Sequence, residues 1–123
     1  MHRQLAFTIL FLALSSSASA AGLSCSIRPA KDMQPAQLQK LTKVTQAEAQ
    51  KTAVAKIKAS SIKIESGELE VEVGCLVYSF DIAVPGKPGI EEIMVDAGTG
   101  RVLSHKHETT KQEAAERAKD GQP

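Results

Sequence analysis

Two stretches decide the fold: GELEVEVGCLVYSFDIAV, residues 67–84, and IEEIMVDAGTGRVLS, residues 90–104. Each reads as a β-hairpin, because apolar and polar residues alternate on either side of a glycine-containing break. That period of two is typical of a strand with one buried and one solvated face. Between the two stretches, a connection rich in proline and glycine cannot continue a hydrogen-bonded ladder.

The first hairpin has a register that its own side chains support. A two-residue turn at Val73-Gly74 pairs Val71 with Leu76 and Leu69 with Tyr78. The large apolar side chains then share one face, and a slip of one residue would move one strand's set to the other face. Valine is a poor residue for a tight hairpin turn, so a bulged loop stays open as an alternative.

The second hairpin turns at residues 96–100, where two glycines supply positive φ at little steric cost. A four-residue loop places Val95 opposite Val102 and Met94 opposite Leu103. Both faces of this half of the sheet are then partly apolar. We therefore expect it to be covered on both sides or to lie at an interface.

Two helix starts flank the hairpins. Thr45 and Glu48 form a capping box, in which each side chain bonds a backbone N–H of the helix start. One narrow, small-residued face follows at helical spacing: Ala49, Ala53 and Ile57. Thr110 and Glu113 give a second such signal before an alanine-containing polar tail. The sequence thus predicts an α+β fold, with an N-terminal helix packed on a small antiparallel sheet of two hairpins and a short C-terminal helix.

The first twenty residues have the three parts of a secretory signal peptide: a basic start at Arg3, an apolar run over residues 5–14, and Ala18-Ser19-Ala20. A lipoprotein anchor at Cys25 is the rival reading. The predicted organisation is a signal peptide (1–20), an extended linker (21–40), a folded domain (41–107) and a polar C-terminal helix or tail (108–123).

Charge and composition exclude several partners. Without Arg3 the chain carries 14 basic and 14 acidic residues. That balance gives no electrostatic reason to expect nucleic-acid binding. Aromatic residues make up 3% of the chain and tryptophan is absent, which disfavours a stacking platform for bases. The apolar run is shorter than the roughly 20 residues that span a bilayer, so we expect no membrane-spanning segment.

Cys25 and Cys75 are the two cysteines of the chain. Since their spacing fits no metal site, a disulfide is the simplest expectation in an oxidising compartment. The alternative is a reactive thiol at Cys75, although no neighbouring cation in the sequence would lower its pKa.

The order of these elements resembles the PepSY domain family over residues 41–107. The positions that match are Thr45, Glu48, Ala49, Leu69, Tyr78, Phe80, Ile93, Val95, Asp96, Ala97, Thr99, Gly100, Val102 and Leu103. The segment VDAGTGRVL is the most specific part. The resemblance implies a helix on a small antiparallel sheet, and an inhibitory or chaperone-like role toward secreted peptidases.

Candidate chemistry is sparse. His105 and His107 lie on one side of a strand and could bind a metal, but a metal site needs three or four ligands. Asp96 stands almost alone in its glycine-rich loop, so a turn explains it better than a calcium site. An acidic row on one strand face reads as a solvated face: Glu65, Glu68, Glu70 and Glu72.

No catalytic constellation or cofactor motif is visible, so we expect neither an enzyme nor a bound cofactor. The leading hypothesis is an exported, non-catalytic PepSY-like module that binds protein or peptide partners, peptidases among them, at a sheet edge or exposed face. The alternative is a small envelope protein that binds metal through His105 and His107. The sequence leaves the oligomeric state open.

Overall fold

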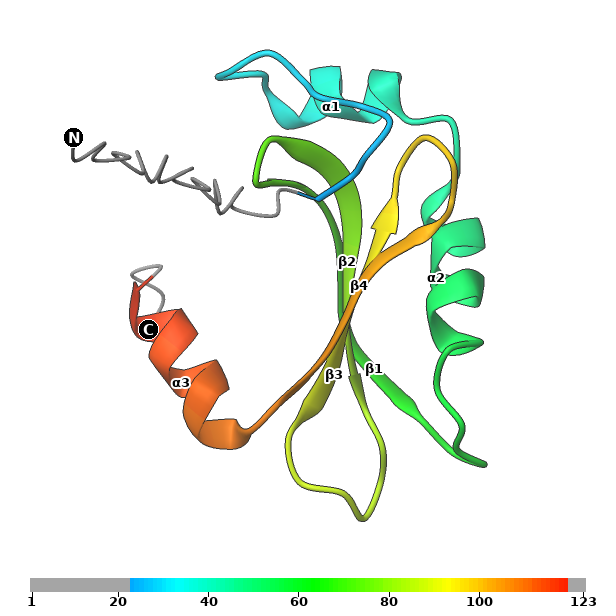
Figure 1. Ribbon diagram of the computed structural model, residues 1–123, viewed down its shortest axis with the longest axis vertical. Coiled ribbons are helices and arrows are strands. Elements are labelled where there is room, and N and C mark those ends of the chain that lie inside the picture. Colours follow the sequence, from blue (N-terminus) through cyan, green and yellow to red (C-terminus); the bar gives the residue numbers. More distant parts are fainter. Residues whose placement is uncertain (1–22, 120–123) are drawn as a thin grey trace, which may run out of the picture.

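The computed structural model describes residues 23–119, and the signal-peptide prediction for residues 1–20 lies outside them. Three short helices and four strands follow in the order α1 (Pro35–Leu41), α2 (Gln46–Val54), β1 (Lys63–Glu72), β2 (Cys75–Ala83), β3 (Ile90–Asp96), β4 (Val102–Glu108) and α3 (Thr110–Lys119). The strands form one twisted sheet, with α2 and α3 on opposite faces (Figure 1).

The first hairpin has the predicted register. Val71 pairs with Leu76 and Leu69 with Tyr78, on antiparallel strands. The two-residue turn is confirmed as well, because Val73 and Gly74 both have positive φ, at 49° and 77°. That combination is the geometry of a primed hairpin turn, and the bulged alternative is therefore wrong.

The second hairpin follows the prediction only at its loop end. Val95 pairs with Val102, and the Asp96 N–H donates to the Arg101 carbonyl oxygen at 2.8 Å. Met94, however, pairs with Ser104 and not with Leu103, since a bulge interrupts the ladder at this point. A bulge sets two residues of one strand against one of its neighbour. Val102 packs against the main apolar cluster and Leu103 against a second cluster on the other face.

The predicted fold class is wrong. We expected one N-terminal helix on a sheet of two hairpins, but the described residues form a single four-stranded antiparallel sheet that carries only short helices. Their N-terminal end has no helix, since residues 23–34 are irregular. The hairpins merge because β2 pairs with β3 across six residue pairs. The sheet, not a helix, supplies most of the buried apolar side chains.

The main core lies between the sheet and α2. The sheet contributes fully buried side chains from β2 and β3, including Tyr78 and Phe80, while α2 contributes Ala49 and Ala53. Small residues let the helix backbone approach the sheet closely. The capping box at Thr45 is confirmed, with N–H···O distances of 3.0 and 3.1 Å.

A short helix, α1, occupies part of the predicted linker. Pro35 stands at the first helical position, where its missing N–H costs nothing. Gln34 and Gln37 complete a capping box, a signal that the sequence reading did not use. Leu38 and Leu41 from this helix pack against the main core.

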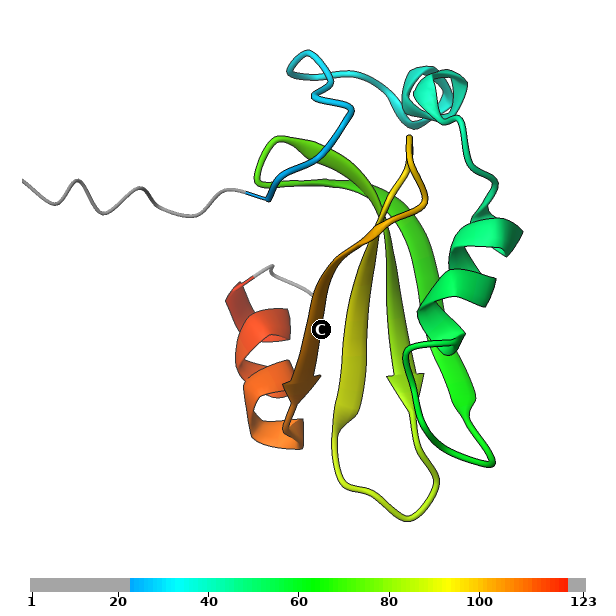
Figure 2. The same ribbon diagram turned by 45° about the vertical axis from the view of Figure 1, so that its right-hand side comes forward.

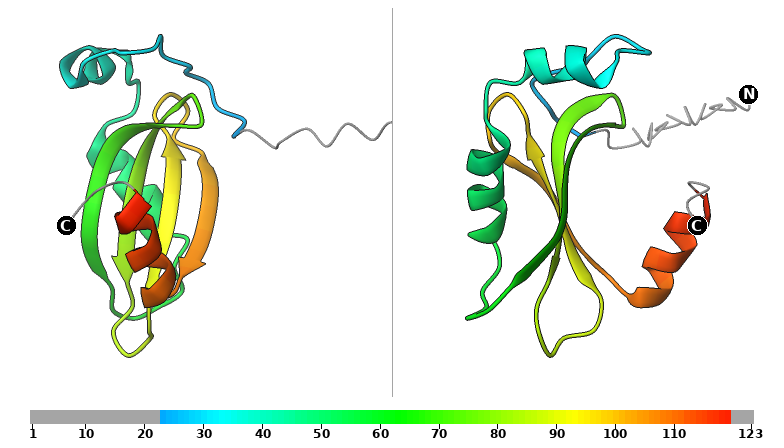
Figure 3. Two further views of the ribbon diagram at one scale, coloured as in Figure 1. Left: turned by 90° about the vertical axis from the view of Figure 1, so that its left-hand side faces the viewer. Right: turned by 180° about the vertical axis from the view of Figure 1, so that it is seen from behind.

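The opposite face of the sheet is partly covered. Near the β2 start it carries a second apolar cluster of Cys75, Val77 and Met94, against which Leu23 and Leu103 pack. Farther along the sheet, α3 lies on the same side and leans away from the strands (Figures 1 and 3). The two-sided burial expected for this part of the sheet is thus confirmed.

Candidate functional site

The sheet has two edge strands, β1 and β4, which Figure 3 (left) shows on opposite sides of the molecule. Between them β1 is the longer, with ten residues against seven. Its pairing with β2 is regular over the seven residues from Ser66 to Glu72, after a bulge near Glu65. An edge strand presents backbone N–H and C=O groups that can pair with another chain.

Two large apolar side chains are exposed in the described part of the chain, and both lie at the turn end of β1. Val71 is 44% exposed and Val73 is 68% exposed. On the other face of the same strand, carboxylates recur at every second residue: Glu68, Glu70 and Glu72. The β1 edge is therefore apolar on one side and acidic on the other.

The carboxylates of this second face repel one another. Burial raises the pKa of Glu70, and Glu72 raises it further, while a hydrogen bond from Ser79 opposes both effects. Burial likewise raises the pKa of Asp81, with the Ser66 hydroxyl opposing it. The face thus holds negative charge at an electrostatic cost that a nearby cation would relieve.

The second candidate cluster is built on β3 and β4. Glu91 pairs with His107 across the ladder, and His105 lies two residues earlier on the same face. Glu91 Oε2 lies 2.9 Å from His105 Nε2, and Oε1 lies 3.0 Å from His107 Nδ1. Burial would raise the pKa of Glu91, but the hydrogen bonds from His107 and His105 hold it below its ordinary value.

These two histidines share one face, as the sequence predicted, and the carboxylate between them was not foreseen. Among the described residues, no group of three or more His, Cys, Asp or Glu side chains is arranged to hold a metal ion. In the geometry present here, Glu91 bonds each imidazole separately.

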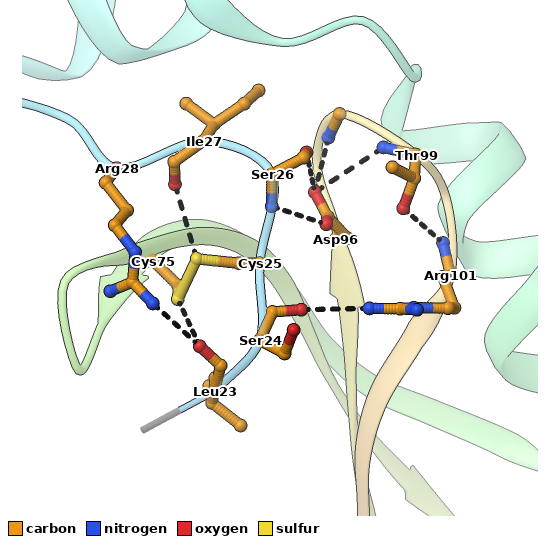
Figure 4. The surroundings of a disulfide bond; sticks show 11 residues. Leu23, Ser24, Cys25, Ser26, Ile27, Arg28, Cys75, Asp96, Thr99 and Arg101 are labelled. Carbon is orange, nitrogen blue, oxygen red and sulfur yellow. Dashed lines mark hydrogen bonds between the residues drawn. A yellow bond between two sulfur atoms is a disulfide. The ribbon is translucent and has the colours of Figure 1, made fainter. Parts of the chain in front are cut away.

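A third cluster fastens the N-terminal segment to the sheet (Figure 4). The disulfide between Cys25 and Cys75 is present, as predicted, with a sequence separation of 50. Beside it, Asp96 is 1% exposed and accepts hydrogen bonds from the Ser26 N–H at 2.9 Å and the Ser26 hydroxyl at 2.7 Å. We call residues 23–28 the N-terminal strap, which Figure 2 shows beside the tip of the first hairpin.

Asp96 binds the strap and its own turn together. Its Oδ1 atom also accepts from the N–H groups of Gly98 at 2.8 Å and Thr99 at 3.4 Å. Burial would raise the pKa of Asp96, but these four hydrogen bonds, led by that from the Ser26 hydroxyl, lower it. Gly98 is required by space, because a Cβ there would collide with Ser26 Oγ and crowd Ile27.

Sequence reasoning assigned Asp96 to a turn and missed its long-range partner. The turn is confirmed by the Gly100 N–H, which donates to the Asp96 carbonyl oxygen at 2.9 Å. Nothing in the sequence ties Ser26 to Asp96, which lies 70 residues away. The one usable signal was the predicted disulfide, since it brings residue 25 to the same end of the sheet.

Comparison with known proteins yields no relative. No protein-family model matches the chain, and neither a curated protein nor a solved structure matches it. The PepSY resemblance therefore stays a prediction from the residues quoted above. Among the helices of residues 23–119, none is long and apolar enough to cross a membrane.

Proposed function

We propose that this protein is an exported, non-catalytic binding module of the PepSY type, which takes protein or peptide partners at an open sheet edge. Secreted or periplasmic peptidases are the partner class that the resemblance implies. The observation that carries the proposal is the long, regular β1 edge with its exposed valines. Strand addition to such an edge gives affinity through the backbone and specificity through alternate side chains.

Export is supported by the disulfide and by the leader-like first twenty residues. Disulfides persist in oxidising compartments and are rare in the cytosol. The Cys25–Cys75 bond is compatible with such a location.

A capture experiment tests this function. The oxidised protein, immobilised and crosslinked, is exposed to the exported fraction of its own cells, and captured proteins are identified by mass spectrometry. We expect a peptidase or another exported protein, and slower cleavage by that peptidase when the module is added. The proposal fails if nothing is retained and no secreted peptidase is slowed.

A second candidate function, metal binding, rests on the imidazoles of His105 and His107 meeting at Glu91. If Glu91 released them, the two imidazole rings could bind one Cu²⁺ or Zn²⁺ ion, metals that such ligands suit. Calorimetric titration of the oxidised protein tests it. The candidate is discarded if no binding tighter than millimolar is found, or if replacing both histidines by alanine leaves the titration unchanged.

A further inference from the structure

We propose that the β1 edge binds an extended peptide segment in which lysine or arginine alternates with apolar residues. This inference rests on the proposed function and deepens it, because it assigns one edge and one partner chemistry. Three independent features of β1 support it: the direction of its backbone groups, the chemistry of its two sides, and the cost of keeping Val73.

The backbone of β1 presents its free groups at alternate residues. Leu76 uses its N–H for the Ile27 carbonyl and its C=O for the Ala97 N–H, both away from β1. Its partner Val71 is therefore in a non-hydrogen-bonded pair, and the N–H and C=O of Val71 point to the open edge. By the same alternation Leu69 and Gly67 also point outward.

At Gly67 the edge is partly occupied. The Gln46 side chain, from the first residue of α2, donates to the Gly67 carbonyl oxygen at 3.0 Å. This bond limits an incoming strand at that end, so the open stretch is centred on Leu69 and Val71. A segment of about six residues would cover it at the usual strand rise of roughly 3.4 Å per residue.

The two faces of this stretch favour different side chains in a bound peptide. A residue placed opposite Val71 on an added strand lies on the α2 side, where Val71 offers exposed apolar surface, and the exposed Val73 follows at the turn. Its neighbours lie on the other side, beside Glu70 and Glu72. Opposite charges across a strand pair are favourable, and a cation there would also relieve the repulsion that raises the pKa of Glu70.

Val73 destabilises the folded protein when no partner is bound. A β-branched residue at φ 49° is strained, since asparagine or glycine suits this position. Its side chain is also 68% exposed, so it gains little from burial. A bound peptide that covers Val73 and Val71 would give both side chains apolar contact.

The other edge fits such a segment less well. A bulge interrupts the β3–β4 register between Val102 and Ser104, which leaves five regular pairs up to Glu108. Its exposed residues are His105, Lys106 and His107, so it offers two imidazoles and an ammonium group in place of carboxylates. Bulges and lysines are devices by which edge strands avoid pairing.

The test measures binding of synthetic octapeptides to the oxidised full protein by fluorescence anisotropy. The probe alternates valine with lysine, and the two controls alternate valine with glutamate or carry N-methyl groups on every second amide. We expect the valine–lysine peptide to bind and to weaken as salt increases. In NMR spectra, amide shifts should centre on Leu69 and Val71. Equal binding of all three peptides would overturn the proposal.

Variants of Val71 test whether the peptide binds at the β1 edge. Val71→Pro removes an outward N–H that β2 does not use, and Val71→Lys keeps the backbone but adds a like charge. Val71→Pro should weaken binding of the valine–lysine peptide about tenfold, the effect of a lost hydrogen bond with an unpaired partner. Val71→Lys should also weaken it, because the added positive charge repels the lysines of the peptide and the apolar contact of Val71 is lost. Gln39→Lys, an equal charge change on exposed α1, should leave affinity unchanged. Thermal unfolding checks that each variant is folded, and Val71→Lys decides the matter if the proline variant is not.

The outcomes separate this inference from the proposed function. If captured proteins bind the Val71 variants as tightly as they bind the unchanged protein, the binding function stands and the β1 assignment is wrong. If the protein forms a dimer that Val71→Pro abolishes, the edge takes a second copy and the peptide proposal is overturned. If no protein is captured and no peptide binds, both proposals fail.

Discussion

Replacing Asp96 by asparagine should weaken the attachment of the N-terminal strap, which the disulfide still holds. Its two carboxylate oxygens accept four hydrogen bonds, two of them from Ser26. Asparagine keeps one oxygen and presents an NH₂ group in place of the other, so at least one N–H donor loses its partner in a site that is 1% exposed. A lost bond to a charged group together with an unpaired buried donor costs about 2–3 kcal/mol. For a domain of this size that loss lowers the Tm by roughly 10–20 °C.

The assay is thermal and denaturant unfolding of the oxidised protein at pH 7, with Asp81→Asn as the matched control. Burial raises the pKa of Asp81 and the charges of Glu65 and Glu68 raise it further, so its neutral replacement should unfold at the same or a higher temperature. Hydrogen exchange should show faster exchange of the Leu76 amide in the Asp96 variant, because this amide bonds the strap at Ile27.

The pH dependence supplies an independent check. Because the pKa of Asp96 is lowered in the folded state, its contribution is complete above the ordinary value of 3.8 and is lost as the pH falls through the folded value. Acid should therefore narrow the stability gap between the unchanged protein and Asp96→Asn. The reasoning is refuted if the two differ by less than about 0.5 kcal/mol at pH 7, or if their gap widens in acid.

Reducing the Cys25–Cys75 bond should lower the free energy of unfolding by about 4 kcal/mol, which is the chain-entropy value for a closed loop of this length. Denaturant unfolding curves with and without reductant measure the difference. Unchanged curves would contradict it. Val73→Asn should raise the free energy of unfolding by about 1 kcal/mol, because asparagine tolerates the positive φ that strains valine. Calorimetry tests this, and a lower Tm for the variant would contradict the turn geometry. Replacing both histidine partners of Glu91 by glutamine should raise the pKa of Glu91, since burial then acts against weaker hydrogen bonds, and NMR titration of its side chain would detect the sign.

Local patterns were sufficient for the features that depend on neighbours in the chain. The alternation of Leu69 and Val71 with acidic residues determined the first register, and the Thr45–Glu48 spacing determined the start of α2. Both follow from the geometry of one or two elements. The bulge beside Leu103 was missed because two apolar residues in sequence fit either a regular ladder or a bulged one.

The merging of the two hairpins and the role of Asp96 could not be read from local patterns. Whether β2 pairs with β3 depends on the path of the loop between them, and the proline–glycine composition of that loop does not specify it. The Ser26–Asp96 bonds join residues 70 positions apart, with polar side chains that are common in turns. The open β1 edge likewise follows from the strand order, which is a property of the whole sheet.

The connection between α1 and α2 is joined to the sheet mainly through main-chain atoms. The N–H groups of Lys43 and Val44 donate to the Ala97 carbonyl oxygen at 2.9 and 3.1 Å, and the Tyr78 hydroxyl donates to the Val44 carbonyl oxygen at 2.8 Å. Any residue other than proline can supply such bonds, so substitutions of Lys43 should preserve this junction, while the Val44 side chain also packs against the main core. Tyr78 has no such freedom, because its hydroxyl supplies one of the three bonds and its ring is fully buried. This junction can therefore be retained while many of the surrounding side chains are substituted.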